Sequence, residues 1–337
     1  MAVTWHNHES CGFVVLNNPP VNAINHNMRE GLISAVKWAE REKLKRVILS
    51  GSGRGFAAGA DTKEFDHPPV SPHLPDVINC IEASTVPWIA AIHGAALGGG
   101  GELTLGCRYR IARADATIGF PEVILGLVPG AGATQRLPRL IGLKEALKLI
   151  PTGKTISGRA AMAIGLVDAI DDDPITAAKL IDQKILSEVV PLNLTKAGAD
   201  ETVNYDAARQ IAIRRMRGQE APLTAISLLE MAQTTTFDDG MQKERAAFLA
   251  LRASSQARAL RHIFFTERAA KKAPKAIATQ EFNLKPLDHV VVIGGGTMGS
   301  GIAYAFLNAS IRVTILESDD PGIQRANTAI DKIISAS

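Results

Sequence analysis

Two glutamates follow glycine-rich or proline-containing stretches of this sequence and could share the work of acid–base catalysis. Glu102 comes directly after four consecutive glycines, Gly98 to Gly101, and Glu122 follows Pro121 twenty residues later. Paired carboxylates at one reacting bond can divide the roles of proton donor and proton acceptor. An ordinary alternative stays open for Glu122, because glutamate is seldom buried and a solvated loop residue would look the same.

The glycines before Glu102 indicate a second chemical role, the binding of a negative oxygen. Glycine in a row is costly in a helix or strand, so the backbone needs freedom or close approach there. The N–H groups of such a turn, with the positive end of the following helix, can receive an oxyanion. A second small-residue loop, Gly55 to Asp61, could supply another N–H donor. A plain strand-to-helix turn is the alternative for the glycines.

Alternating strands and helices are expected to position these residues. Apolar runs predict strands that begin near residues 12, 46 and 86, and the segment 28–42 has apolar residues at helical spacing. Such alternation indicates an α/β fold with buried parallel strands. From about residue 173 to 271 the pattern becomes helical, and the Lys-, Ala- and Pro-containing stretch 271–286 is interpreted as a linker.

Composition excludes several classes of protein. The net charge of +3 over 337 residues is too small to indicate a nucleic-acid partner. Three separated cysteines, Cys11, Cys80 and Cys107, form neither a metal-binding pattern nor a disulfide framework, which favours a reducing compartment. The sequence shows no signal peptide and no apolar run of about 18 residues. We therefore expect a soluble cytoplasmic protein with no metal and no membrane insertion.

Three separated motifs resemble, in order and spacing, the crotonase (enoyl-CoA hydratase/isomerase) superfamily. They are FAAGAD at 56–61, ALGGGGELTLGC at 96–107 and FPEVILGLVPGAGATQRLPRLIG at 120–142, and the likeness continues through 152–170. The resemblance implies the crotonase spiral fold of repeated ββα units. It also implies that the Ala60 and Gly99 amides bind a thioester oxygen. In the same pattern, Glu102 activates water and Glu122 donates a proton to Cα of a 2-enoyl-CoA.

The part of the site that would hold CoA is less specific in the sequence. By resemblance, Ala58, Ala60 and Lys63 match the loop that contacts adenine and phosphate, and a plain solvated lysine fits Lys63 as well. Three positions depart from the residues common in hydratases: Gly101, Phe120 and Ala133. Two other functions stay open, a double-bond isomerase that needs one carboxylate and a silent acyl-CoA-binding module.

A dinucleotide motif stands near the end of the sequence. Residues 287–318 run as an apolar strand, the turn Gly294-x-Gly296-x-x-Gly299, a helix, and a strand that ends in Glu317. In this context the glycines are expected to hold a pyrophosphate and the acid a ribose hydroxyl, so NAD is the predicted cofactor. A glycine turn that only packs a helix on a strand is the alternative. The segment resembles the start of the NAD domain of 3-hydroxyacyl-CoA dehydrogenases.

The order of these parts resembles a multifunctional β-oxidation enzyme, of the peroxisomal bifunctional type or a bacterial relative. We expect a crotonase core at 1–185, a helical region and linker at 186–285, and an incomplete Rossmann βαβ unit at 286–337. The sequence is accordingly interpreted as a fragment of a longer chain, which would add the dehydrogenase. The resemblance implies an acyl-CoA substrate, no cofactor for hydration, and a monomer or small homo-oligomer. A peroxisome is the alternative compartment if the source is eukaryotic.

Overall fold

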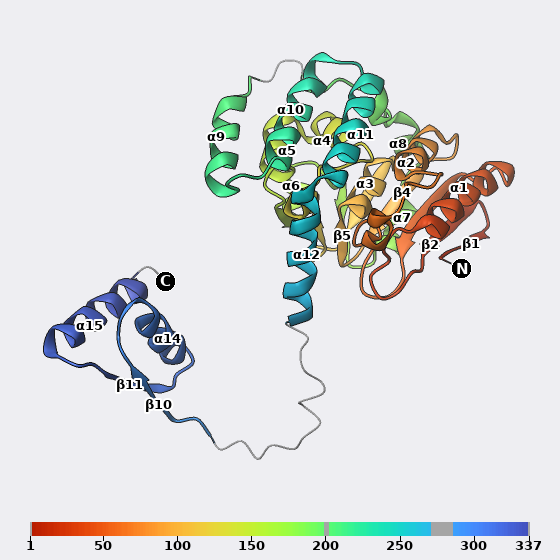
Figure 1. Ribbon diagram of the computed structural model, residues 1–337. Helices are drawn as coiled ribbons and strands as arrows, with labels where there is room; N and C mark the ends of the chain where they lie inside the picture. The colour runs from red at the N-terminus through yellow and green to blue at the C-terminus, as the bar shows by residue number, and fades with distance from the viewer. Residues whose placement is uncertain (1, 199–201, 271–285, 336–337) are drawn as a thin grey trace. The chain divides into compact units, whose positions relative to one another are not determined.

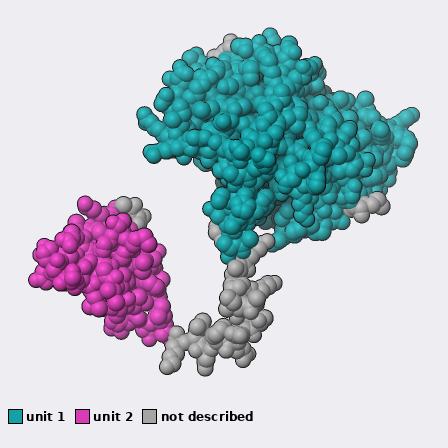
Figure 2. All heavy atoms as spheres, in the orientation of Figure 1, with its two compact units in different colours: residues 1–271 teal, residues 272–337 magenta. Residues whose placement is uncertain are grey.

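The computed structural model describes residues 2–198, 202–270 and 286–335. The chain divides into two compact units, residues 1–271 and 272–337, which Figure 2 colours separately. The interdomain linker expected at 271–286 lies almost wholly outside the described residues. The expected boundary near residue 185 falls inside the first unit and stays a prediction.

A six-stranded sheet forms the base of the first unit, with the strand order β1-β2-β3-β4-β6-β9. Only β1 runs antiparallel within it, and the other strands pair in parallel. The strands are β1 (Val3–His8), β2 (Cys11–Leu16), β3 (Arg46–Gly51), β4 (Trp88–Ile92), β6 (Tyr109–Ala112) and β9 (Ala169–Ile170). All five residues of β4 are buried. The α/β fold with buried parallel strands expected from the sequence is thus confirmed.

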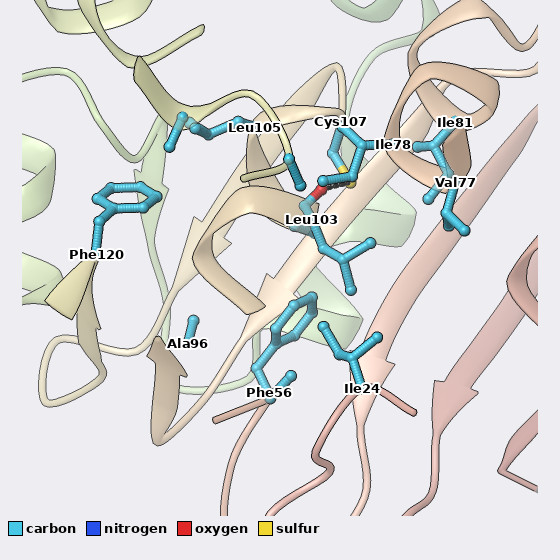
Figure 3. Close-up of a cluster of buried hydrophobic side chains, with 14 of the residues drawn as sticks. Ile24, Phe56, Val77, Ile78, Ile81, Ala96, Leu103, Leu105, Cys107 and Phe120 are labelled. Carbon is cyan, nitrogen blue, oxygen red and sulfur yellow. Dashed lines mark hydrogen bonds between the residues drawn. The ribbon is translucent and has the colours of Figure 1, made fainter. Parts of the chain in front are cut away.

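A smaller sheet carries the residues of the predicted site. It contains β5 (Ala95–Leu97), β7 (Thr117–Gly119) and β8 (Thr155–Ser157), with β5 and β7 parallel. The helix α3 (Gly99–Leu105) follows β5 directly, and all seven of its residues are buried. Figure 3 shows Leu103 of this helix together with Ile24 and Phe56 in the core.

Helices cover these sheets and continue to the end of the first unit (Figure 1). The earlier helical segments are α1 (His26–Arg41), η1 (Thr62–Asp66), α2 (Leu74–Ala83), η2 (Pro121–Leu125), α4 (Ala133–Ile141), α5 (Leu143–Leu149) and α6 (Gly158–Ala163). The later ones are α7 (Pro174–Leu180), α8 (Gln183–Glu188), η3 (Leu192–Leu194), α9 (Tyr205–Arg215), α10 (Ala221–Thr234), α11 (Phe237–Ala253) and α12 (Ser255–Ala270). Helices α10 and α11 pack on α4, and α12 packs on η2. The predicted helical extension therefore reaches the segments that carry the site.

The second unit is a β-α-β-α arrangement around a two-stranded parallel sheet. It consists of β10 (His289–Ile293), α14 (Thr297–Asn308), β11 (Arg312–Leu316) and α15 (Asp320–Ser335). Its small core is Val292, Ala303 and Ile330. Large apolar side chains stay exposed on it, among them Ile293 at 85% and Met298 at 79%. The β-α-β order with two parallel strands agrees with the Rossmann βαβ unit expected from the sequence.

Candidate active site

The pairing of β5 with β7 brings the two glutamates to one edge of the small sheet. Leu97, the last residue of β5, pairs with Gly119, the last residue of β7. The two strands are parallel, so their carboxyl ends meet at the same edge. The Gly98 amide continues the ladder and donates to the Gly119 carbonyl at 2.9 Å. Glu102 and Glu122 both lie a few residues beyond these strand ends.

The turn at Gly98 places the Glu122 carboxylate directly beside it. Gly98 has a φ of +52°, and a Cβ on this residue would lie 2.8 Å from Oε1 of Glu122. Oε2 of Glu122 is buried and has no hydrogen-bond partner among the described residues. Burial, and then the charges of Glu102 and Glu244, hold the pKa of Glu122 well above its ordinary value. The solvated-loop interpretation does not fit these surroundings, because the carboxyl is enclosed.

Glu102 occupies a different environment, although it is also buried. It is 3% exposed, and its Oε1 accepts the Ala131 and Ala133 N–H groups at 2.9 and 3.1 Å. Burial raises the pKa of Glu102, while these two amides and the charges of Arg136 and Arg245 act to lower it. The two amides and the two arginines therefore offset part of the effect of burial on Glu102, whose pKa is still raised.

Two amides beside the carboxylates are free to receive an oxygen. Within the described residues, neither the Ala60 nor the Gly99 amide donates to a protein acceptor. Gly99 begins α3, where first-turn amides have no intrahelical partner. A Cβ built on Gly99 would lie 3.5 Å from the Ala60 nitrogen, so the two loops approach closely. This arrangement can hold a developing negative charge.

The residues expected to contact CoA are solvent-accessible. Ala58 and Lys63 are exposed, and Lys63 lies in η1 with no ion-pair partner in the described part of the chain. Two of the residues that depart from those common in hydratases, Gly101 and Phe120, pack against each other: a Cβ on Gly101 would lie 3.1 Å from the Phe120 ring. The Phe120 ring thus occupies space that a larger residue at position 101 would need.

Sequence reasoning missed a third buried carboxylate, Glu244 of α11. It is completely buried, and burial with the charge of Glu102 raises the pKa of Glu244 to about 8. No local signal in the sequence marks it, because Lys243 and Arg245 beside it are typical of a solvated helix face. Only the structure shows that Glu244 lies with Gly240 and Leu251 on the buried face of α11.

The glycine turn of the second unit has the shape a dinucleotide requires. Gly294 has a φ of +87°, and a Cβ on Gly299 would lie 1.8 Å from the Gly294 carbonyl oxygen. Nothing lies within 4 Å of a Cβ built on Gly296, which leaves room for a ligand at the start of α14. Oε1 of Glu317 accepts the Gly295 N–H at 2.6 Å, so the acid stands at the turn. These residues fit the diphosphate and ribose of NAD.

The part of the chain that the structure describes contains no cluster of three or more metal-ligating side chains. The same residues contain no helix long and apolar enough to cross a membrane.

Comparison with known proteins finds relatives that are similar in sequence to nearly all of this chain. The chain is 38% identical to a protein named peroxisomal bifunctional enzyme of Cavia porcellus, over 96% of this chain and 46% of that protein. It is 36% identical to a peroxisomal fatty acid beta-oxidation multifunctional protein of Oryza sativa subsp. japonica, over 94% and 46% respectively. The chain thus spans about half the length of the curated relatives it matches.

Family models and a solved structure complete the comparison. A solved enoyl-CoA hydratase/isomerase of Pseudoalteromonas atlantica shares the fold, with a TM-score of 0.59 and 21% identity over 79% of this chain and 98% of that one. A model described as 3-hydroxyacyl-CoA dehydrogenase, NAD binding domain, matches residues 289–337, and one described as enoyl-CoA hydratase/isomerase matches residues 6–213. The first of these two matches places a segment of the NAD-binding domain family at residues 289–337. The chain belongs to the enoyl-CoA hydratase/isomerase family.

Proposed function

We propose that the first unit hydrates 2-trans-enoyl-CoA to 3-hydroxyacyl-CoA in fatty-acid β-oxidation. The observation that carries the proposal is the meeting of Glu102 and Glu122 beside two free amides. A conjugated thioester needs an acid, a base and an oxyanion site at once, and this edge of the sheet supplies all three. The family to which the chain belongs and the names of its relatives support the same activity.

The amides of Ala60 and Gly99 are proposed to stabilise the enolate oxygen. Addition of water at Cβ pushes charge onto the thioester oxygen, and N–H groups aimed at that oxygen lower the barrier. Each such donor contributes roughly 3–4 kcal/mol in comparable acyl-transfer sites. Binding of the CoA portion along Ala58 and Lys63 stays a prediction.

The two carboxyl groups are proposed to handle the two protons. Glu102, whose charge the Ala131 and Ala133 amides stabilise, takes a proton from the attacking water. Glu122, whose pKa is held well above its ordinary value by burial and by the charges of Glu102 and Glu244, delivers a proton to Cα. Groups whose environments separate their pKa values in this way commonly divide acid and base roles.

The test is the loss of the conjugated-enoyl absorbance when crotonyl-CoA is mixed with the protein. We expect catalytic loss of that absorbance and formation of 3-hydroxybutyryl-CoA, identified by chromatography. If the protein binds crotonyl-CoA without consuming it, the silent-module alternative holds instead. If it shifts the double bond of 3-enoyl-CoA but hydrates nothing, the chain is an isomerase alone.

The second unit supports a further proposal about the whole protein. Gly294, Gly296, Gly299 and Glu317 would hold NAD, which supplies hydride-accepting chemistry when bound. In a full-length relative this would add oxidation of 3-hydroxyacyl-CoA, the product of the proposed hydration. The relatives' names favour the peroxisome over the cytoplasm as the compartment. A monomer or small homo-oligomer is the expected state.

A further inference from the structure

A buried carboxylate on α11 holds the first turn of α4. Oε1 of Glu244 accepts the Gly132 N–H at 2.6 Å, and Oε2 accepts the Thr134 N–H at 2.8 Å. The Thr134 hydroxyl also donates to Oε2, at 2.6 Å. Glu244 is thus bound by three donors of one turn. The contact joins residues more than 100 positions apart in the sequence.

The other two amides of that turn donate hydrogen bonds to Glu102, the proposed base. Glu102 accepts the N–H groups of Ala131 and Ala133, which alternate along the chain with the two amides bound by Glu244. The N-terminus of α4 therefore binds two carboxylates from distant parts of the sequence. Its amides cannot turn toward one carboxylate without turning away from the other, because successive N–H groups belong to one rigid backbone.

The packing of α11 against this turn is close on both sides of Glu244. A Cβ on Gly240 would lie 2.1 Å from Oε1 of Gln135. One turn beyond Glu244, the Phe248 ring lies 2.5 Å from the position of a Cβ on Gly130. Gly240, Glu244 and Phe248 follow one another at intervals of four residues, so they lie on one face of α11. This face packs against the turn that begins α4.

We propose that Glu244 is a positioning residue of the hydratase site. By holding two amides of the α4 turn, it fixes the other two, which orient the Glu102 carboxylate toward water. The inference rests on the proposed hydration of enoyl-CoA and deepens it. Glu244 itself does not touch the substrate; it acts through the backbone of residues 131–134.

The charge of Glu244 also interacts with Glu122, the proposed acid. The charged groups that interact with Glu244 are Glu102 of α3, Glu122 of η2 and its own neighbour Arg245 on α11. Because the pKa of Glu244 is raised to about 8, this residue carries its charge at alkaline pH, where the charge raises the pKa of Glu122. Neutralising position 244 should therefore make Glu122 lose its proton at a lower pH.

The test compares Glu244→Gln with the unmodified protein, using crotonyl-CoA over a range of pH. Glutamine keeps the size of the side chain but offers one acceptor oxygen in place of two. We expect kcat to fall about tenfold to a hundredfold with KM little changed, as for displaced catalytic groups. The alkaline limb of kcat/KM should move to lower pH. Glu188→Gln, which neutralises an exposed glutamate on α8, should match the unmodified protein in both.

The outcomes separate this inference from the proposed function. If the unmodified protein hydrates no enoyl-CoA, the proposed function fails and the inference fails with it. If the unmodified protein is active and a folded Glu244→Gln keeps its kcat and pH profile, the inference alone is overturned.

A second pair of variants decides the matter if Glu244→Gln does not fold. Thr134→Val removes the hydroxyl that donates to Glu244 and that accepts from Gln135 Nε2, and Thr134→Ser keeps this hydroxyl. We expect the valine variant to lose about three- to tenfold in kcat, the size of one buried hydrogen bond. The serine variant should retain more activity than the valine variant. Equal kcat in the two would overturn the inference.

Discussion

Glu102 and Glu122 have the same side chain but lie in two different environments. The Glu102 carboxylate is bound by two helix amides, whereas Oε2 of Glu122 has no partner within the described residues. Burial raises the pKa of both; the Ala131 and Ala133 amides offset part of this effect at Glu102, whereas at Glu122 its own backbone amide acts in that direction. This difference in hydrogen bonding is the reason for proposing Glu102 as the base and Glu122 as the acid.

We predict that Glu102→Gln and Glu122→Gln each reduce hydration strongly and keep acyl-CoA affinity. Proton transfer by a positioned group contributes about 10²–10⁴-fold in rate, and glutamine cannot transfer the proton. Steady-state rates with crotonyl-CoA and calorimetric titration of a non-reacting acyl-CoA measure the two quantities. Rates near those of the unmodified protein in both variants would falsify the two-carboxylate mechanism.

The two variants should differ in isomerase activity. Moving a double bond needs one carboxyl that shuttles a proton at Cα, the role proposed for Glu122. We therefore expect Glu102→Gln to convert 3-enoyl-CoA faster than Glu122→Gln does. The appearance of conjugated-enoyl absorbance measures both rates. Equal loss in the two variants would show that the roles are not divided in this way.

At the scale of elements, a buried ion pair ties α4 to α2. Arg136 is fully buried, and its Nη2 lies 2.7 Å from Oε2 of Glu82, which is 3% exposed. Nη1 of the same guanidinium donates to the carbonyl of Ala131, at the turn that binds Glu102. The arginine therefore fixes both the helix and its first turn.

Arg136→Met should destabilise the first unit by about 3–5 kcal/mol, because it leaves the buried Glu82 carboxylate without its partner. Arg41→Met is the matched control, since Arg41 pairs with Glu42 at the surface with 72% of its side chain exposed. Its loss should cost about 0–1 kcal/mol. Urea unfolding of both variants gives the two free energies. Similar small values would mean that the buried pair adds little to stability.

The elements that hold the site differ in how well sequence predicts them. Apolar runs and consecutive glycines are local signals, so the strands and the Gly98 turn could be predicted, and with them the edge that carries Glu102 and Glu122. Glu244 could not, because its neighbours Lys243 and Arg245 give that stretch the appearance of a solvated face. Its burial depends on α11 packing over residues 130–135, a contact between distant parts of the chain.

At the scale of the whole molecule, the second unit presents half of a dinucleotide crevice. A dinucleotide binds across two halves of a doubly wound sheet, and the described part of this unit has two strands. The glycine turn and Glu317 can meet the pyrophosphate and one ribose. The described residues offer no wall for the nicotinamide.

We predict that a polypeptide of residues 1–337 hydrates 2-enoyl-CoA but does not oxidise 3-hydroxyacyl-CoA with NAD. Calorimetric titration with NADH should show weak binding or none. Glu317→Gln provides a comparison, because it alters the acid at the turn and leaves the first unit unchanged. Micromolar NADH binding that Glu317→Gln weakens would contradict the prediction and show a completed site.

Because the Phe120 ring packs over Gly101, the effect of a substitution at one of these positions should depend on the residue at the other. Figure 3 shows Phe120 apart from the group formed by Ile24, Phe56 and Leu103, although all four belong to one buried core. A Cβ at position 101 would lie 3.1 Å from the ring and 3.2 Å from the Gly119 carbonyl oxygen, so Phe120→Leu would relieve part of the crowding that Gly101→Leu creates. The single substitution at position 101 should impair hydration more than the double substitution does. Such epistasis would favour one order of mutations when these two positions change in a lineage.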